Sequence, residues 1–328
     1  MTATTARRTS RTSRARLAVT AAAAATAVTG TTMLTLAMAA PAASAAVQLN
    51  CTAVPSACGY PDATNSGVPA GTTLLAVPGQ VSSGPGWHYV TSGYVAVTGA
   101  GAVLSGLYIP YNVDITASGV TIKNSRIVTS GSFAVSLRHT SNVTITHSTI
   151  SGANATSGRA GVDISDIYGD STGMTITGDN LSNFKTAIQV TTGLISGNYI
   201  HDPGYVAGDH TNGIFDTGST QALSITGNTI LNSMNQTDAI GLFEDFGSQA
   251  NRVITGNLLA GGGYPIYAGQ KSGGAATSHI VVTNNRISTL YFPNGGQWGA
   301  VTGVSTGGSG NSWSGNVWDG TGASLPAP

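Results

Sequence analysis

Ile225-Thr-Gly-Asn-Thr-Ile230 and, 29 residues later, Ile254-Thr-Gly-Asn-Leu-Leu259 are two copies of one short pattern. An apolar residue is followed by two small or polar residues, a polar residue that is usually Asn, any residue, and a second apolar residue. Six further copies begin at Ile122, Ile145, Ile176, Ile195, Val282 and Trp313. Successive copies begin 23, 31, 19, 30, 29, 28 and 31 residues apart. This uneven spacing favours coils whose strands are constant and whose loops vary in length.

A second apolar stretch follows the copies of this pattern. These stretches are centred on Val135, Val162, Ile188, Ile214, Ile240, Ile266 and Val301. Apolar and polar residues alternate over four to six positions with Gly and Asn at the corners, which favours β-strands over helices. We therefore expect two strands in each coil, each parallel to its equivalent in the next coil, with the inward residues forming apolar ladders.

The fourth position of the pattern forms a column of asparagines. Its members are Asn198, Asn228, Asn257, Asn285 and Asn316. Asn at a corner adopts the left-handed conformation more readily than most residues, and its amide can hydrogen-bond along a stack. We interpret this column as turn chemistry rather than as a site.

The first 45 residues have the order of an export signal. Five arginines lie among the first sixteen residues, an apolar run from Leu17 to Ala40 follows, and the small-residue site Ala43-Ser44-Ala45 comes after Pro41. The run is long enough to span a membrane, but its many Ala and Thr residues make it weakly hydrophobic. We therefore expect cleavage near residue 45 and a secreted, extracellular protein without a membrane segment; the export route stays open.

The composition narrows the class of partner. Only 8% of the 328 residues are charged, against about 25% in a typical protein, which excludes a charged coiled coil. The full chain has 13 Lys+Arg and 13 Asp+Glu, so loss of the five N-terminal arginines leaves 8 basic and 13 acidic residues. A net charge of about −5 has the wrong sign for a nucleic acid partner. We expect a monomer.

Cys51 and Cys58 are the only cysteines, and both follow the expected cleavage site. An exported chain meets an oxidising compartment, and this stretch lacks the histidines of a metal site and the basic neighbour of a catalytic thiol, so we predict one disulfide. We expect a single domain. Residues 46–90 form a disulfide-stapled N-terminal cap, residues 91–319 form roughly ten coils, and residues 320–328 form a tail.

The chain resembles the exported right-handed parallel β-helix proteins of bacteria, the pectate-lyase-like architecture. The resemblance covers nearly all of the mature chain, and residues 59–74 and 315–322 are similar to the first and last segments of actinobacterial members. It implies an all-β, single-domain solenoid. Lyases, hydrolases and uronate epimerases share this scaffold, so for function the resemblance implies only action on polysaccharides.

Two long loops indicate where a site would lie. Residues 201–211 and 288–298 each join the first strand of a coil to the second, three coils apart. At about 4.8 Å per coil they would wall a groove of about 14 Å, enough for two or three sugar units. The coils between them contribute Asp238, Glu244, Asp245, Tyr264, Tyr267 and Lys271.

The segment Asp209-His210-Thr211-Asn212-Gly213-Ile214 is similar to a His-x-Asp-Gly-Ile pattern of bacterial β-helix proteins. Asn212 replaces the Asp of that pattern, which puts a metal or proton role at this position in doubt. His210 is a candidate general base or acid, because imidazole titrates near neutrality; the alternative is a turn-capping role.

Asp216 shares a column with Leu137, Ile164, Val190, Leu242 and Ala268, which the alternation places facing inward. Because an unpaired buried charge is costly, we expect the strand to bend and present Asp216 to solvent; the alternative is a buried acid with a raised pKa. Two further acids, Asp163 and Asp166, are expected to form an ion-pair patch with Arg159 and Lys185.

A polysaccharide lyase is the first of three functional hypotheses. It removes the proton beside a uronate carboxylate, which requires a base and a group that neutralises the carboxylate. The candidate bases are His210, Lys185 and Tyr205. The candidate neutralising groups are Asn212, Lys271, and calcium bound by Asp238, Glu244 and Asp245. The net negative charge argues against a polyanion unless bases or calcium line the groove.

The other two hypotheses use different side chains. A glycoside hydrolase would use two carboxylates, Asp216 or Asp209 with Asp238 or Glu244, whose separation decides between retention and inversion. A non-catalytic cell-wall or glycan-binding module would use aromatic platforms. The candidate platforms are Tyr264, Tyr267, Tyr291 and Trp298. We favour an enzyme over a binding module and a lyase narrowly over a hydrolase, and an epimerase stays open.

Overall fold

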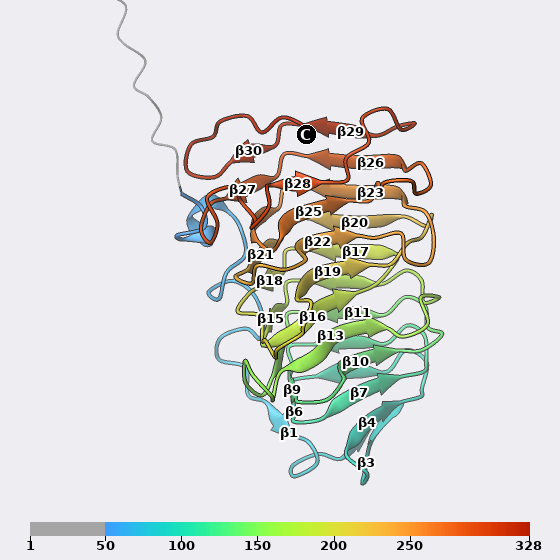
Figure 1. Cartoon of the computed structure of the whole chain (residues 1–328). Helices are drawn as coiled ribbons and strands as arrows, with labels where there is room; N and C mark the ends of the chain where they lie inside the picture. The colour runs from blue at the N-terminus through green and yellow to red at the C-terminus, as the bar shows by residue number, and fades with distance from the viewer. Residues whose placement is uncertain (1–49) are drawn as a thin grey trace, which may run out of the picture. The chain divides into compact units, whose positions relative to one another are not determined.

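Three stacked β-sheets form the body of residues 50–328, the part of the chain that the computed structural model describes (Figure 1). The expected export signal lies outside the described residues. Within residues 50–328, the only helix is the 3₁₀ turn η1 (Pro55–Cys58). No helix in this part is long and apolar enough to cross a membrane.

Sheets A, B and C have ten, eleven and nine strands, and nearly all neighbouring strands are parallel. Sheet A contains β1 (Leu75–Ala76), β6 (Leu107–Ile109), β9 (Arg126–Thr129), β12 (Thr149–Gly152), β15 (Asn180–Ser182), β18 (Tyr199–Ile200), β21 (Thr229–Asn232), β24 (Leu258–Gly261), β27 (Arg286–Ser288) and β30 (Val317–Trp318). Sheet B contains β2 (Ser83–Gly84), β3 (Trp87–Val90), β4 (Tyr94–Val97), β7 (Asn112–Ile115), β10 (Phe133–Leu137), β13 (Ala160–Asp166), β16 (Phe184–Gln189), β19 (Asn212–Asp216), β22 (Asp238–Leu242), β25 (Tyr264–Ala268) and β28 (Val301–Thr302). Sheet C contains β5 (Val103–Ser105), β8 (Thr121–Lys123), β11 (Thr144–Thr146), β14 (Thr175–Thr177), β17 (Gly193–Ser196), β20 (Leu223–Thr226), β23 (Ala250–Thr255), β26 (Ser278–Thr283) and β29 (Ser312–Ser314).

The sheets are the sides of a parallel β-helix, which confirms the predicted fold. The chain passes from sheet C to sheet A to sheet B and then begins the next coil. The nine strands of sheet C mark nine coils, close to the expected ten. Each coil has three strands, so the prediction of two was wrong.

The third strand arises because the six-residue pattern contains two strands and a sharp corner between them. In the copy that begins at Ile225, the first apolar residue belongs to β20 and the last, Ile230, belongs to β21. Gly227 turns the chain between them with a φ of 63°, a conformation that glycine adopts without a steric penalty. The left-handed residue is therefore the one before Asn228, and not the asparagine itself as predicted.

The apolar positions of the pattern stack in register through the whole solenoid. The first positions pair from Ile122 to Trp313 in sheet C, and the last positions pair from Ile127 to Trp318 in sheet A. In sheet B, Ile164 takes the place predicted for Val162, because it is Ile164 that pairs with Val135. These columns supply most of the buried core, so burial of apolar side chains holds the coils together.

The asparagine column forms a hydrogen-bonded ladder inside one corner. The side-chain amide nitrogen of Asn198 donates to Oδ1 of Asn228 at 2.9 Å, and that of Asn228 donates to Oδ1 of Asn257 at 3.0 Å. The backbone nitrogen of Asn228 also donates to Oδ1 of Asn257 at 2.9 Å. Asn285 and Asn316 continue the same pattern. The predicted bonding along the stack is therefore confirmed.

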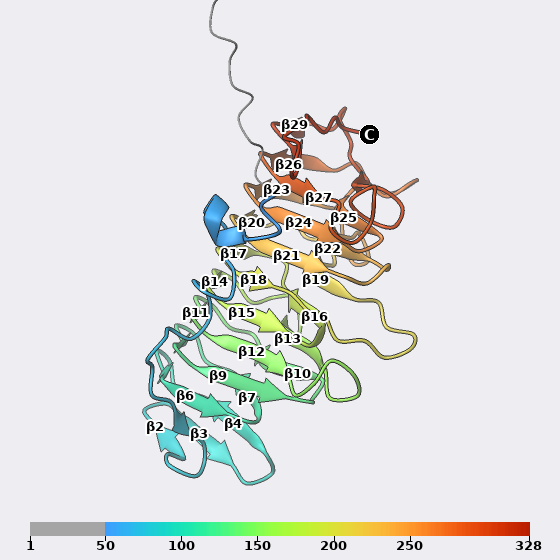
Figure 2. The ribbon, with the colours of Figure 1, turned by 90° about the vertical axis from the view of Figure 1, so that its left-hand side faces the viewer.

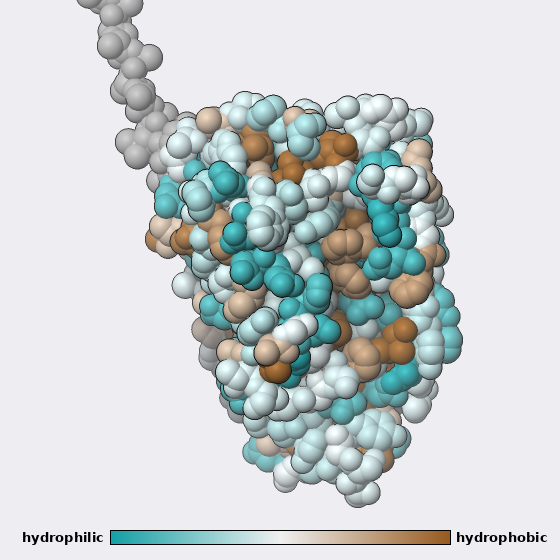
Figure 3. Space-filling model, in the orientation of Figure 1, coloured by the Kyte–Doolittle hydropathy of each residue, from teal (hydrophilic) through white to brown (hydrophobic). Residues whose placement is uncertain are grey.

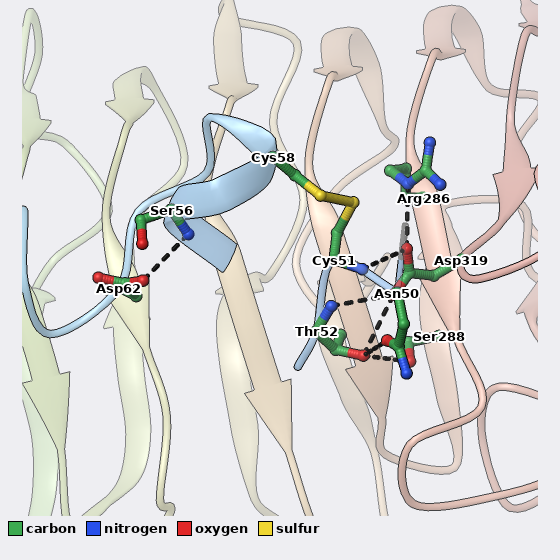
Figure 4. The surroundings of a disulfide bond; sticks show 9 residues. All are labelled: Asn50, Cys51, Thr52, Ser56, Cys58, Asp62, Arg286, Ser288 and Asp319. Atoms are coloured by element: carbon green, nitrogen blue, oxygen red, sulfur yellow. Dashed lines mark hydrogen bonds and ion pairs between the residues drawn. A yellow bond between two sulfur atoms is a disulfide. The ribbon is translucent and has the colours of Figure 1, made fainter. Parts of the chain in front are cut away.

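Residues 50–74 form an N-terminal strap that runs along the stack beside sheet A (Figure 2). At one end, the Asp319 carboxylate accepts hydrogen bonds from the backbone nitrogens of Cys51 and Thr52, both at 3.0 Å (Figure 4). Further along, the backbone nitrogen of Gly67 donates to the carbonyl of Gly178 at 2.8 Å. The strap ends where β1 pairs with β6. It therefore connects the last coils to the first.

The predicted disulfide joins Cys51 to Cys58 within this strap. It lies beside the last coils, because the Asp319 carboxylate holds the backbone nitrogen of Cys51 there. The first coil is instead covered by β2, β3 and β4, which pair in an antiparallel way before β4 joins β7.

Candidate functional site

The outer face of sheet B carries a straight column of side chains that continues over six coils. Successive partners in the strand register are Phe133, Val162, Thr186, Asn212, Asp238 and Tyr264. Five steps of about 4.8 Å separate its two aromatic ends, a distance of about 24 Å. The column therefore offers a linear track parallel to the axis of the solenoid.

Four aromatic rings form a continuous row over β19, β22 and β25. The ring centroids of Phe215 and Phe243 are 5.3 Å apart, those of Phe243 and Tyr267 are 5.1 Å apart, and those of Tyr267 and Tyr264 are 5.3 Å apart. Sugars commonly stack on such surfaces because aromatic rings combine a large apolar area with a defined shape. In Figure 3, tan to brown hydrophobic surface lies next to teal hydrophilic surface in the region of β22 and β25.

Two hollows meet at Tyr267. The first, of about 340 Å³, is lined by His210, Asn235, Gln236, Thr237, Tyr267 and Trp298. The second, of about 380 Å³, includes Phe243, Glu244, Asp245, Tyr267, Gln270 and Lys271 in its lining. We call the two hollows together the groove. Six of the predicted site residues line it, and two more, Asn212 and Tyr264, lie on the column beneath. The structure therefore brings eight of the predicted site residues together.

The loops that wall the first hollow are held by backbone contacts. The Asn232 amide donates to the carbonyl of Thr211 at 2.8 Å, and Thr237 also donates its hydroxyl to that carbonyl. On the other side, the backbone nitrogen of Trp298 donates to the carbonyl of Gly263 at 2.9 Å. His210 and Trp298, from the two loops predicted to wall a groove, therefore border the same hollow.

His210 and Tyr267 differ in how the protein surrounds them. The His210 side chain is exposed, and no described residue forms a hydrogen bond with its ring, so a turn-capping role has no support. Burial is the largest cause that raises the pKa of Tyr267 from 10.0 to about 12. Tyr267 is therefore a proton donor at neutral pH, whereas an imidazole is a ready acceptor.

Asp238 lies beneath this surface. It is fully buried, and among the described residues neither of its carboxylate oxygens has a hydrogen-bond partner. Burial raises its pKa well above 3.8, so it carries a proton over a wide pH range. Because the carboxyl group is out of contact with solvent, it does not meet a ligand directly.

Asp216 does not turn to solvent, and this expectation was wrong. Asp216 and Arg252 are both 0% exposed, and Oδ2 of Asp216 lies 2.9 Å from Nε of Arg252. Arg252 also donates to Gln249 at 2.8 Å and to the carbonyl of Ser219 at 2.7 Å. Burial raises the pKa of Asp216 and Arg252 opposes that shift. An internal ion pair satisfies this carboxylate, so no bend in the strand is required.

The inward column that contains Asp216 also has a different membership from the one predicted. Asp166, and not Ile164, pairs with Leu137, so two acids occupy this column. Asp163 and Asp166 are both buried, and burial raises the pKa of each. They form no ion-pair patch with Arg159, because Arg159 pairs with Asp209.

The remaining predicted site residues lie away from Tyr267. Arg159 binds both carboxylate oxygens of Asp209. Burial of Asp209 acts to raise its pKa, but the hydrogen bond from Arg159 outweighs this effect and holds the pKa below 3.8. Lys185 lines a different hollow with Arg159. Tyr205 is 44% exposed on its loop. Tyr291 approaches Gly261, and burial, together with Asp202, raises its pKa.

The expected calcium site is not formed by the described residues. No three His, Cys, Asp or Glu side chains in residues 50–328 converge on a point that could hold a metal ion. Asp238 is enclosed under the sheet surface, Glu244 lies against Gly274, and Asp245 is exposed. These three carboxylates therefore do not act as a common ligand set.

Phe215 and Phe243 were missed by the sequence analysis. The signal for Phe215 was available, because it occupies the same outward position as Tyr267 in the strand register. Phe243 lies after the end of β22, in a loop whose path the sequence pattern does not specify.

No protein-family model matches the sequence, and no curated protein matches it. What is established is therefore the architecture, an all-β solenoid of three largely parallel sheets with a disulfide near the start of the described chain.

Proposed function

We propose that the protein is a secreted, pectate-lyase-like enzyme that cleaves a uronate-containing polysaccharide by β-elimination in the groove over sheet B. The observation that carries this proposal is the position of Tyr267, which lines one hollow with His210 and the other with Lys271. A base and a proton donor therefore line one hollow, the same proton donor and a cation line the next, and an aromatic row provides a platform for the sugar rings.

Each of these groups has a role in an elimination. Lys271 offsets the charge of the uronate carboxylate, which makes the neighbouring carbon more acidic. The imidazole of His210 takes the proton from that carbon as the carbon–carbon double bond forms. The bond to the glycosidic oxygen breaks, and Tyr267, whose raised pKa keeps its hydroxyl protonated, donates the proton that the leaving oxygen needs. The two side chains then exchange protons with solvent and return to their starting states.

A hydrolase is less well supported because three of the four carboxyl groups predicted to catalyse hydrolysis are enclosed or paired with an arginine. Asp216 is paired with Arg252 in the interior, Asp209 is paired with Arg159, and Asp238 is enclosed. Glu244 is then the one predicted catalytic acid that lines a hollow of the groove. Retaining and inverting mechanisms both need two carboxyl groups.

The proposal is tested with the purified mature protein and a panel of uronate-containing and neutral polysaccharides, with and without calcium. Absorbance of unsaturated products and release of reducing ends are followed in parallel. Elimination raises both signals together, and an increase in reducing ends alone would refute the proposal in favour of hydrolysis.

Tyr267→Phe and Tyr264→Phe form a matched pair of variants. Each loses only a hydroxyl, and the two rings contact each other on β25. We expect Tyr267→Phe to lower kcat by about 10²- to 10⁴-fold, the range for general acid–base catalysis, with little change in KM, and Tyr264→Phe to retain most activity. His210→Ala should lower kcat in the same range. Equal effects of the two tyrosine variants would contradict the role of Tyr267.

A non-catalytic glycan-binding function is the second candidate, and the aromatic row from Phe215 to Tyr264 favours it. It predicts binding without product formation. In that case Tyr267→Phe would leave affinity nearly unchanged because the ring remains, whereas Tyr267→Ala would weaken binding by removing the platform.

A further inference from the structure

The loop that carries His210 is fastened to a loop of an earlier coil. Arg159 comes just before β13, Asp209 lies in the loop before β19, and β16 lies between these two strands in sheet B. At about 4.8 Å per step, the later loop therefore reaches back over about 10 Å. It packs directly on the earlier loop, because a Cβ atom at Gly204 would lie only 2.6 Å from Cβ of Arg159. Two loops from different coils thus form one packed unit.

An ion pair between Arg159 and Asp209 joins the two loops. Nε and Nη2 of Arg159 donate to the two oxygens of the Asp209 carboxylate, and the side chains are only 19% and 9% exposed. The same carboxylate accepts from the backbone nitrogen of Val206 at 2.8 Å. A bidentate arginine contact fixes direction as well as distance, because it consists of two parallel hydrogen bonds. The pair therefore determines where Asp209 lies relative to the earlier coil.

The residues on both sides of His210 are held by such contacts, whereas its own side chain is not. Asp209 is held by the ion pair, and the carbonyl of Thr211 accepts from the Asn232 amide at 2.8 Å. The imidazole of His210 is exposed, forms no hydrogen bond with a described residue, and borders the hollow that Tyr267 also lines. The backbone on its two sides therefore decides where the imidazole lies in the groove.

We propose that Arg159 and Asp209 are positioning residues that hold His210 at the groove. This inference rests on the proposed function for the role of the imidazole. It gives Asp209 a task other than acid catalysis, because Arg159 and Val206 engage its carboxylate and it lines neither hollow of the groove. Loss of the ion pair leaves the loop attached but less defined in position, and a displacement of about 1 Å can cost about 10²-fold in rate.

Arg159→Ala and Arg138→Ala form a matched pair of variants. Each removes the arginine from an arginine–aspartate pair between coils, and Arg138, which binds Asp114 at 2.6 Å, lines neither hollow of the groove. Arg159→Ala should lower kcat by about 10²-fold with little change in KM, whereas Arg138→Ala should leave kcat unchanged. Arg159→Lys keeps the charge but not the bidentate contact, so it should lower kcat by less; it carries the same test if the alanine variant does not fold.

A double-mutant cycle separates positioning from a direct contact with the substrate. If Arg159 acts through the imidazole, adding Arg159→Ala to His210→Ala should cost almost nothing more in kcat. The same loss in both backgrounds, or equal losses with Arg159→Ala and Arg138→Ala, would overturn the proposal.

Hydrogen exchange tests the inference without any activity. Arg159→Ala should accelerate exchange in residues 206–211 and not in β22, and Arg138→Ala should accelerate neither. Unchanged exchange in residues 206–211 would overturn the proposal whether or not the protein cleaves a glycan. Acceleration in a protein that forms no unsaturated product would refute the lyase but retain the ion pair as the contact that holds His210. Elimination that Arg159→Ala leaves unaffected would do the reverse.

Discussion

Replacing Asp179 with Asn should stabilise the protein, because Asp179 occupies a rung of the asparagine ladder. Its backbone nitrogen donates to Oδ1 of Asn198 at 2.9 Å, as each asparagine of the ladder does to the next. Asn198 and Asn228 each send a side-chain amide hydrogen to a carbonyl of the preceding coil, at 3.0 and 3.1 Å. An amide at position 179 would reach Ile145 in the same way, whereas Oδ2 of Asp179 has no partner among the described residues.

The gain in stability arises because the folded parent protein must keep a proton on the Asp179 carboxyl group. It is fully buried, and burial raises its pKa well above 3.8 against two opposing backbone hydrogen bonds. The folded state then binds a proton that the unfolded state has lost, so stability is complete below pH 3.8 and declines as the pH rises, by about 1.4 kcal/mol per unit. The cost of holding that proton therefore grows with pH for as long as the folded carboxyl keeps it, and the new hydrogen bonds of the variant add about 1 kcal/mol.

Thermal unfolding of the two proteins between pH 5 and pH 8 measures this effect. For a chain of this size each kcal/mol of stabilisation raises Tm by roughly 2–4 °C. The difference should grow with pH, because only the parent protein loses stability through this residue. Asp245→Asn removes an exposed carboxylate and serves as the control. A Tm difference that is zero, negative or independent of pH would refute the argument.

Three further changes test other parts of the structure. Asp216→Ala leaves Arg252 charged and without its carboxylate in the interior, and should lower the free energy of unfolding by about 3–5 kcal/mol; a urea titration that shows less than 1 kcal/mol would contradict the ion pair. Asp319→Ala removes the acceptor for the backbone of Cys51 and Thr52, so hydrogen exchange should accelerate in residues 50–60 and not in β20. Because hydrogen bonds hold the Asp319 pKa below 3.8 despite its partial burial, the protection of these amides relative to their intrinsic exchange rates should fall in the parent protein as the pH falls through that range, and protection that is independent of pH would count against it. Ile225→Ala opens a cavity in the core and should cost about 2–5 kcal/mol by urea titration, whereas a loss below 1 kcal/mol would show that the coils collapse around it.

Part of the candidate site follows from the sequence because strand register is a local property. Once the repeat is recognised, residues at equivalent positions of successive coils must be neighbours, and this places Asn212, Asp238 and Tyr264 on one column. The two loops that flank the groove could be identified for the same reason, since their lengths differ from those of neighbouring coils. His210 and Trp298 then meet across one hollow.

The partners of the acidic side chains could not be predicted in this way. Alternation correctly placed Asp216 on an inward column, but its partner Arg252 comes from β23, two coils further on in a different sheet. Arg159 and Asp209 are 50 residues apart and meet because a loop folds back over two coils. Such contacts depend on loop paths and side-chain directions, which a repeat pattern does not encode.

By itself, the sequence determined the solenoid, the positions of the repeats, most of the stacking register and the disulfide, because each depends on residues that are close in the chain or equivalent in the repeat. Only the tertiary structure decided which carboxyl groups face a ligand, which ones an arginine neutralises, and that the first described residues bind the last coils. Those outcomes depend on burial and on the distances between charges from remote segments. Burial decides whether a carboxyl group in this protein is an accessible acid, half of an ion pair or a neutral part of the core.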